Sequence, residues 1–119
     1  MPITDITQFK NAVTKLEQAL AQTKNEFIRD SVIQRFEFSV KLAWKTAKKL
    51  MGSSSTAPKG LIREMAQNQF ISDTELWLKA VDMRNLSSHT YQEELADQVY
   101  DFAKMFLPHL KQLLAHMEK

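Results

Sequence analysis

Three residues with useful chemistry stand close together in the last third of the sequence: Arg84, His89 and Tyr91. An arginine side chain presents a planar fork of donors that fits a phosphate group, and a histidine side chain can exchange a proton near neutral pH. The backbone N–H groups at the start of a helix would add donors for an anion. This combination predicts a site for the chemistry of phosphodiester bonds.

Arg84 and His89 can act together only if the chain breaks its helix between them. Five residues of unbroken helix turn through about 500°, so the two side chains would point roughly 140° apart. Ser87, Ser88 and a helix cap at Thr90 predict such a break, with Arg84 ending one helix and His89 just before the next. A purely structural role stays open, in which the arginine caps carbonyl groups and the histidine completes a turn.

The elements around this segment are predicted to be helices. Apolar residues recur at alternating spacings of three and four, and three pairs with the capping-box spacing mark helix starts. These pairs are Thr23 with Glu26, Ser72 with Glu75, and Thr90 with Glu93. We expect helices over residues 5–22, 23–50, 58–69, 72–84 and 90–117. The expected fold is all-α, an up-and-down antiparallel four-helix bundle with one extra short helix, in a single domain over 1–119.

The composition narrows the possible functions. The chain has no cysteine, which excludes disulfides and thiolate chemistry, and its net charge of +2 is too small for a protein that coats nucleic acid nonspecifically. Any RNA contact should be local, and no DNA partner is expected. Met1–Asp5 lacks the basic and apolar regions of a leader and no apolar run reaches the roughly 20 residues that span a bilayer, so we expect a cytoplasmic protein without a membrane partner. His109 and His116 lack a third ligand, so neither a metal site nor a cofactor is expected.

The spacing of Arg84, His89 and Tyr91 resembles the Arg-x-x-x-x-His-x-Tyr signature of HEPN-domain proteins, and Asn85 matches the polar residue that often follows the arginine. Nearly the whole chain resembles the nucleotidyltransferase substrate-binding protein family within HEPN. The segments that carry this resemblance are Arg35-Phe36-Glu37-Phe38, Leu42-Ala43-Trp44-Lys45 and Ser88-His89-Thr90-Tyr91.

The resemblance implies a homodimer that associates with a minimal nucleotidyltransferase, often called MNT. Related HEPN proteins are metal-independent endoribonuclease toxins, in which the arginine and histidine of both subunits meet. The nucleotidyltransferase silences some of them by adding AMP to the motif tyrosine. Carried over to this chain, Arg84 and His89 would be catalytic, Tyr91 would be nucleotidylated and Asn85 would support them. The alternative is a non-catalytic, substrate-binding subunit of a two-component nucleotidyltransferase.

Two expectations concern the predicted helix over 23–50. Glu37 is the best candidate to orient Arg84, although it could instead be an ordinary solvated carboxylate. Phe38 and Leu42 form a second apolar patch that one isolated bundle would leave partly in water, so we expect the homodimer to cover it. In the predicted helix over 90–117, Tyr91 is expected at the first position, with its hydroxyl exposed.

Overall fold

The computed structural model describes residues 5–119, and this part of the chain contains helices and no strand. The elements are α1 (Thr7–Leu20), α2 (Glu26–Met51), α3 (Pro58–Gln67), α4 (Thr74–Leu86), the 3-10 turn η1 (Ser87–His89) and α5 (Glu93–Met117). Four longer helices are therefore joined by one short helix, α3, and the predicted all-α fold is confirmed. The predicted absence of a leader concerns Met1–Thr4, which lie outside the described residues.

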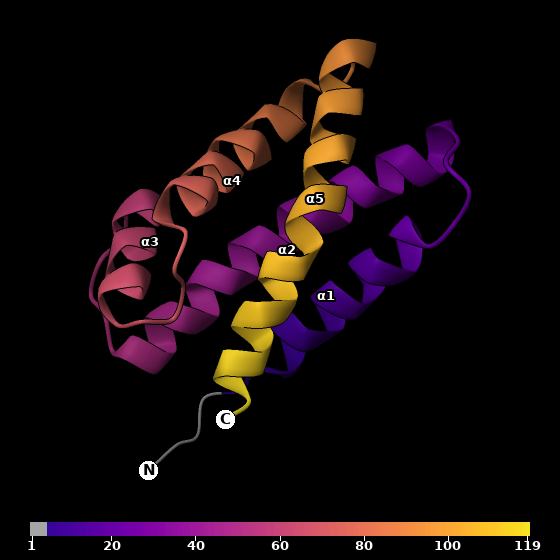
Figure 1. Cartoon of the computed structure of the whole chain (residues 1–119). Helices are drawn as coiled ribbons and strands as arrows, with labels where there is room; N and C mark the ends of the chain where they lie inside the picture. Colours follow the sequence, from indigo (N-terminus) through magenta and orange to yellow (C-terminus); the bar gives the residue numbers. More distant parts are fainter. Residues whose placement is uncertain (1–4) are drawn as a thin grey trace.

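The longest helix, α2, is the centre of the arrangement. Figure 1 shows α1 running back alongside α2, α5 crossing α2 near the middle of the molecule, and α3 lying at the C-terminal end of α2. From there α4 returns to the end of the molecule where α5 begins. Because α2 contacts each of the other elements, it can position side chains that come from distant parts of the sequence.

Aromatic side chains join three helices in the core. Phe36 of α2 is fully buried and meets Phe102 and Phe106 of α5 edge to face, with ring centroids 5.7 and 6.3 Å apart. Trp77 of α4 packs against Phe106 at 4.7 Å. Edge-to-face contacts of this kind add to the stabilisation from burying the rings themselves. These aromatic rings therefore fix the position at which α2, α4 and α5 cross.

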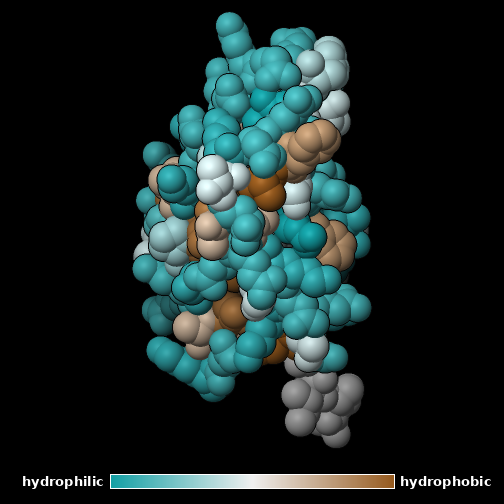
Figure 2. All heavy atoms as spheres, turned by 90° about the vertical axis from the view of Figure 1, so that its right-hand side faces the viewer, coloured by the Kyte–Doolittle hydropathy of each residue, from teal (hydrophilic) through white to brown (hydrophobic). Residues whose placement is uncertain are grey.

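The surface is mainly polar. Figure 2 shows the side of the molecule nearest α1, where hydrophobic residues appear as small separate patches between hydrophilic ones. No helix within residues 5–119 is long and apolar enough to cross a membrane.

The predicted capping residues of α2 and α4 are wrong by one or two positions. The side chain of Asn25, not that of Thr23, accepts a hydrogen bond from the N–H of Ile28 at 2.8 Å. At α4 the cap is Asp73, which accepts from the N–H of Leu76 at 3.1 Å and lies one residue after the predicted cap. Asn and Asp cap helices at least as well as Ser and Thr, so Asn25 and Asp73 can take the place of the predicted caps.

Candidate functional site

The helix is interrupted between Arg84 and His89, as the sequence predicts. α4 ends at Leu86, and the chain then makes the turn η1 before α5 begins at Glu93. The Ser88 hydroxyl donates a hydrogen bond to the main-chain carbonyl of Asn85 at 3.1 Å. Such short-range bonds from hydroxyl groups compete with the regular helical bonds and favour a turn.

The start of α5 differs from the prediction. The Thr90 hydroxyl donates to the carbonyl of Ser87 at 2.9 Å, so it belongs to the turn and does not cap α5. The helix begins after Gln92, and Tyr91 precedes its first turn instead of opening it. That first turn also carries Glu93, whose charge opposes anion binding there. The predicted cap by Thr90 is therefore wrong, and an acidic residue lies at the helix start that follows His89.

Arg84 lies against α2. Its guanidinium stands 3.8 Å from a carboxylate oxygen of Glu37 and over the ring of Trp44, 5.3 Å from the centroid. The Arg84 side chain is 23% exposed, and its buried Nε has no hydrogen-bond partner among the described residues. The arginine is thus held by one long ion pair and one aromatic ring, and its terminal nitrogens make no hydrogen bond among the described residues.

Ser87 joins the turn to the same carboxylate. Its buried hydroxyl lies 2.8 Å from the second oxygen of Glu37 and 2.5 Å from the main-chain carbonyl oxygen of Arg84. A hydroxyl has one proton, so it donates to one of these acceptors at a time. Glu37 therefore contacts both the guanidinium and the first residue of the turn. The sequence predicts Ser87 as part of the break, but it does not show that Ser87 contacts Glu37.

His89 and Tyr91 stand apart from this group. Both are exposed, and their rings meet edge to face with centroids 6.3 Å apart. Within residues 5–119 no hydrogen bond or ion pair connects His89 with Arg84. Asn85 is also exposed, and only its main-chain carbonyl is engaged in the turn. One chain therefore brings Arg84 to Glu37 and His89 to Tyr91, but does not link the two pairs.

A shallow groove of about 270 Å³ reaches Arg84 from the side of α2. The residues that line it are Gln34, Glu37, Phe38, Lys41 and Arg84. Phe38 is 55% exposed in this groove, and Leu42, one turn further along α2, is half-buried against the core. The Phe38 ring is therefore partly exposed to solvent beside Glu37 and Arg84. No group of three or more His, Asp or Glu in the described part of the chain is arranged to hold a metal ion.

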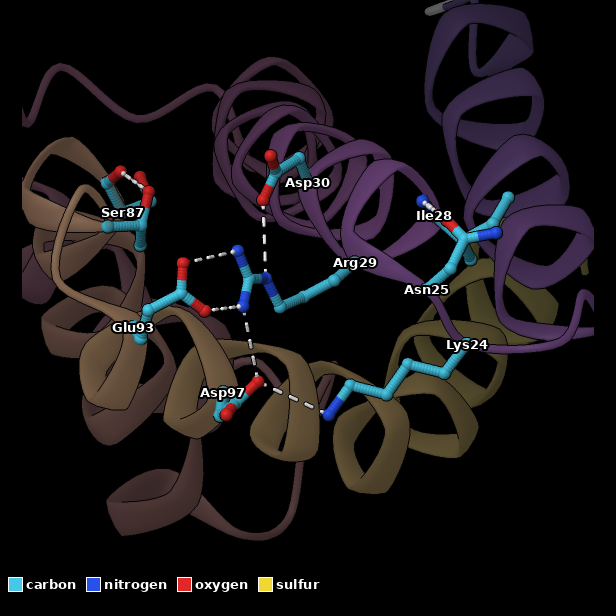
Figure 3. Close-up of polar contacts among 9 residues, drawn as sticks. Lys24, Asn25, Ile28, Arg29, Asp30, Ser87, Glu93 and Asp97 are labelled. Carbon is cyan, nitrogen blue, oxygen red and sulfur yellow. Dashed lines mark hydrogen bonds and ion pairs between the residues drawn. The ribbon is translucent and has the colours of Figure 1, made fainter.

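A second charged network holds the start of α5. Arg29, in the first turns of α2, is buried and binds both carboxylate oxygens of Glu93 (Figure 3). Its guanidinium also lies 3.3 Å from Asp30 and 3.6 Å from Asp97. The bond from Arg29 lowers the pKa of the Glu93 carboxyl, and the same bond raises the pKa of Arg29.

Sequence reasoning missed Arg29. A signal was present, because Arg29 lies on the stripe of α2 that carries the buried residues Val32 and Phe36. A charged residue on a buried stripe needs a partner, and the sequence does not show which carboxylate supplies it.

The chain is similar to known proteins in sequence and in structure. Residues 4–119 match the family model described as nucleotidyltransferase substrate binding protein like. A protein of Haemophilus influenzae named probable ribonuclease HepT is 34% identical over 76 residues, which cover 57% of this chain and 52% of that protein. The chain therefore matches about half the length of this relative. A crystal structure from Thermus thermophilus superposes with a TM-score of 0.85 at 27% identity, over 93% of this chain and 99% of the other.

Acidification should weaken the attachment of α5 to α2. Since the folded state lowers the pKa of Glu93, the pair with Arg29 stabilises the fold above the usual carboxyl range, and this contribution is lost as the pH falls through the lowered pKa. Below about pH 4, we expect the free energy of unfolding to fall more steeply for the wild type than for Glu93→Gln. Urea unfolding across this pH range measures the difference.

The matched control for this experiment is Glu94→Gln, because Glu94 is exposed and forms no ion pair among the described residues. Its pH dependence should follow that of the wild type. If all three proteins lose stability in parallel, the pair between Arg29 and Glu93 does not contribute.

Proposed function

The chain belongs to the nucleotidyltransferase substrate binding protein like family within the HEPN-like superfamily, and from this premise we propose that it is a metal-independent endoribonuclease. It would be the toxin of a HEPN and MNT toxin–antitoxin pair, silenced by its partner nucleotidyltransferase. The observation that carries the proposal is the turn after α4, which puts a partly free arginine and an exposed histidine on either side of a break. The name of the Haemophilus relative agrees with this activity.

In the proposed reaction, His89 takes the proton from a 2′-hydroxyl of RNA. The 2′-oxygen then attacks the adjacent phosphorus, the bond to the 5′-oxygen breaks, and that oxygen takes a proton from water, so a cyclic phosphate and a 5′-hydroxyl result. The proton held by His89 passes to solvent. Arg84 would stabilise the charge on the phosphoryl oxygens through its terminal nitrogens, since its side chain is partly exposed. Glu37 would keep the guanidinium in place from α2. Asn85 remains a supporting residue by resemblance alone.

The second candidate is a non-catalytic subunit that binds substrate for a nucleotidyltransferase. One observation favours it: in a single chain, no contact among the described residues links Arg84 with His89. A catalytic pair would then need a second subunit to bring the two side chains together. The two candidates differ in whether His89 must change its protonation state during turnover.

RNA cleavage by the isolated protein separates these candidates. We expect His89→Ala to lower the rate of cleavage by about 10²-fold or more, because a general base contributes roughly 10² to 10⁴ in rate. Electrophoresis of a labelled single-stranded RNA measures the rate, and circular dichroism shows that each variant is folded. His116→Ala is the matched control, because His116 lies in the last turn of α5, at the opposite end of that helix from His89. Unchanged cleavage by His89→Ala would exclude its catalytic role, and a wild type that leaves RNA intact would favour the non-catalytic subunit.

We further propose that the partner nucleotidyltransferase modifies Tyr91. The tyrosine oxygen would attack the α-phosphorus of ATP, pyrophosphate would leave, and the hydroxyl proton would pass to solvent. The product would place bulk and negative charge beside the His89 ring, 6.3 Å away, where RNA must approach. The chain has two tyrosines, and their exposure differs sharply: Tyr91 is 78% exposed and Tyr100 is 6% exposed.

Incubation with the nucleotidyltransferase, ATP and Mg²⁺ tests this modification. We expect added AMP on the peptide that contains Tyr91, and none on the peptide that contains Tyr100. Mass spectrometry of a protease digest locates the group, and Tyr91→Phe should remain unmodified. Addition of AMP to Tyr91→Phe at the wild-type level would contradict the proposal.

A homodimer is the third part of the proposal. Phe38 is exposed in the groove that ends at Arg84, so a second copy that covers this ring would bring its own surface next to the site. Covering an exposed aromatic ring is favourable because apolar area leaves water.

Sedimentation velocity tests the dimer. We expect the wild type to sediment as a dimer and Phe38→Glu as a folded monomer, because a buried, unpaired carboxylate at the interface is costly. Phe27→Glu is the matched control, since Phe27 is an exposed phenylalanine, 82% accessible, in the first turn of the same helix. A monomeric wild type, or equal loss of the dimer in both variants, would contradict the proposed interface.

A further inference from the structure

Arg29 is the only buried charged residue in the described part of the chain. Removing a guanidinium from water is unfavourable unless its donors are paired. Its partners come from its own helix and from α5, whose first residue, Glu93, takes a bidentate pair. The network in Figure 3 therefore connects the first turns of two helices that are far apart in the sequence.

The environment of Arg29 excludes it as a phosphate-binding residue. Its Nε pairs with Asp30, both terminal nitrogens pair with Glu93, and one of them also faces Asp97. Three carboxylates thus surround one guanidinium, and a phosphate would meet their negative charge. Arg84 is the opposite case, because its Nε is without a partner among the described residues. The two arginines therefore have different roles.

The contacts of Arg29 lie directly beside the motif. Glu93 is the first residue of α5 and follows His89 and Tyr91 after one short turn, in which the N–H of Gln92 donates to the His89 carbonyl at 3.3 Å. A displacement of the start of α5 would therefore move the histidine and the tyrosine with it.

The other side of the motif is tied to the same helix. Glu37 lies about two turns beyond Arg29 on α2 and contacts Arg84 and Ser87. The segment between Arg84 and Glu93 is thus attached to α2 at both ends. Its intervening residues are held by the bonds of the turn itself.

We propose that Arg29 is a positioning residue, which acts through Glu93 to place His89 and Tyr91 relative to Arg84. The proposal rests on the proposed ribonuclease function for its kinetic consequence, but its structural consequence can be measured without any activity. Loss of Arg29 leaves Asp30, Glu93 and Asp97 facing one another without the central cation. These carboxylates are at least half exposed, so water can solvate them, and the aromatic core that joins α2 to α5 remains. We therefore expect a local displacement.

The test compares Arg29→Met with Arg29→Lys and with the control Lys24→Met. Lys24 is half-exposed and contacts Asp97 at 3.2 Å from the outer side of the network, without touching Glu93. An exposed ion pair of this kind contributes little. Arg29→Lys keeps the charge but loses the fork that binds both oxygens, so its effects should lie between those of the wild type and Arg29→Met.

The first measurement is steady-state cleavage of RNA at a temperature where circular dichroism shows every variant folded. We expect Arg29→Met to lower kcat by about tenfold or more while KM changes less than about threefold, because orientation of a reacting group affects the rate more than binding. Lys24→Met should retain the wild-type values. Equal losses of kcat in Arg29→Met and Lys24→Met would overturn the proposal.

The second measurement is amide hydrogen exchange of residues 88–92, which needs no activity. We expect exchange to be about tenfold faster or more in Arg29→Met and unchanged in Lys24→Met, because local opening controls exchange. Unchanged exchange in a folded Arg29→Met protein would overturn the proposal. If the wild type does not cleave RNA, the proposed function fails, and the exchange result still decides the role of Arg29. Should Arg29→Met not fold, Glu93→Gln weakens the same contact from its exposed side and is judged by the same criterion.

Discussion

The segment between α4 and α5 depends on two charged contacts with a single helix. Glu37 of α2 contacts Arg84 and Ser87 before the turn, and Arg29 of α2 binds Glu93 after it. Because α2 is a rigid helix, the distance between these two anchors is set by its geometry. The turn therefore has defined ends although its surface residues are exposed. His89 and Tyr91 therefore lie between two points at which the chain is attached to α2.

The two arginines show how burial separates structural from chemical roles. Arg29 is surrounded by carboxylates that use its donors, and the bonds to Glu93 and Asp30 raise its pKa. Arg84 rests on the Trp44 ring beside one carboxylate at 3.8 Å, and its Nε lacks a partner among the described residues. The donors of Arg29 are thus used within the chain, whereas those of Arg84 are largely unused among the described residues. The same residue type thus has two different environments in one small bundle.

At the start of α5, a threonine hydroxyl could bond in either of two directions, and the sequence does not show which. Thr90 has the spacing of a cap, yet its hydroxyl bonds backwards to Ser87 and extends the turn. As a consequence, Tyr91 lies outside α5 with 78% of its surface exposed. A hydroxyl group can donate to a carbonyl earlier in the chain or accept from an N–H later in the chain, and that of Thr90 donates to the carbonyl of Ser87.

The sequence by itself determined the helical class, the approximate positions of the helices and the break between Arg84 and His89, since periodicity and turn-forming residues act over a few positions. Its motif also identified the family that the comparisons confirm. Only the tertiary structure decided which distant residues meet: Arg29 and Glu93 are 64 positions apart, and Glu37 and Ser87 are 50 apart. Such contacts depend on how α2, α4 and α5 cross, and that crossing is set by the shapes of buried rings, which no local pattern encodes.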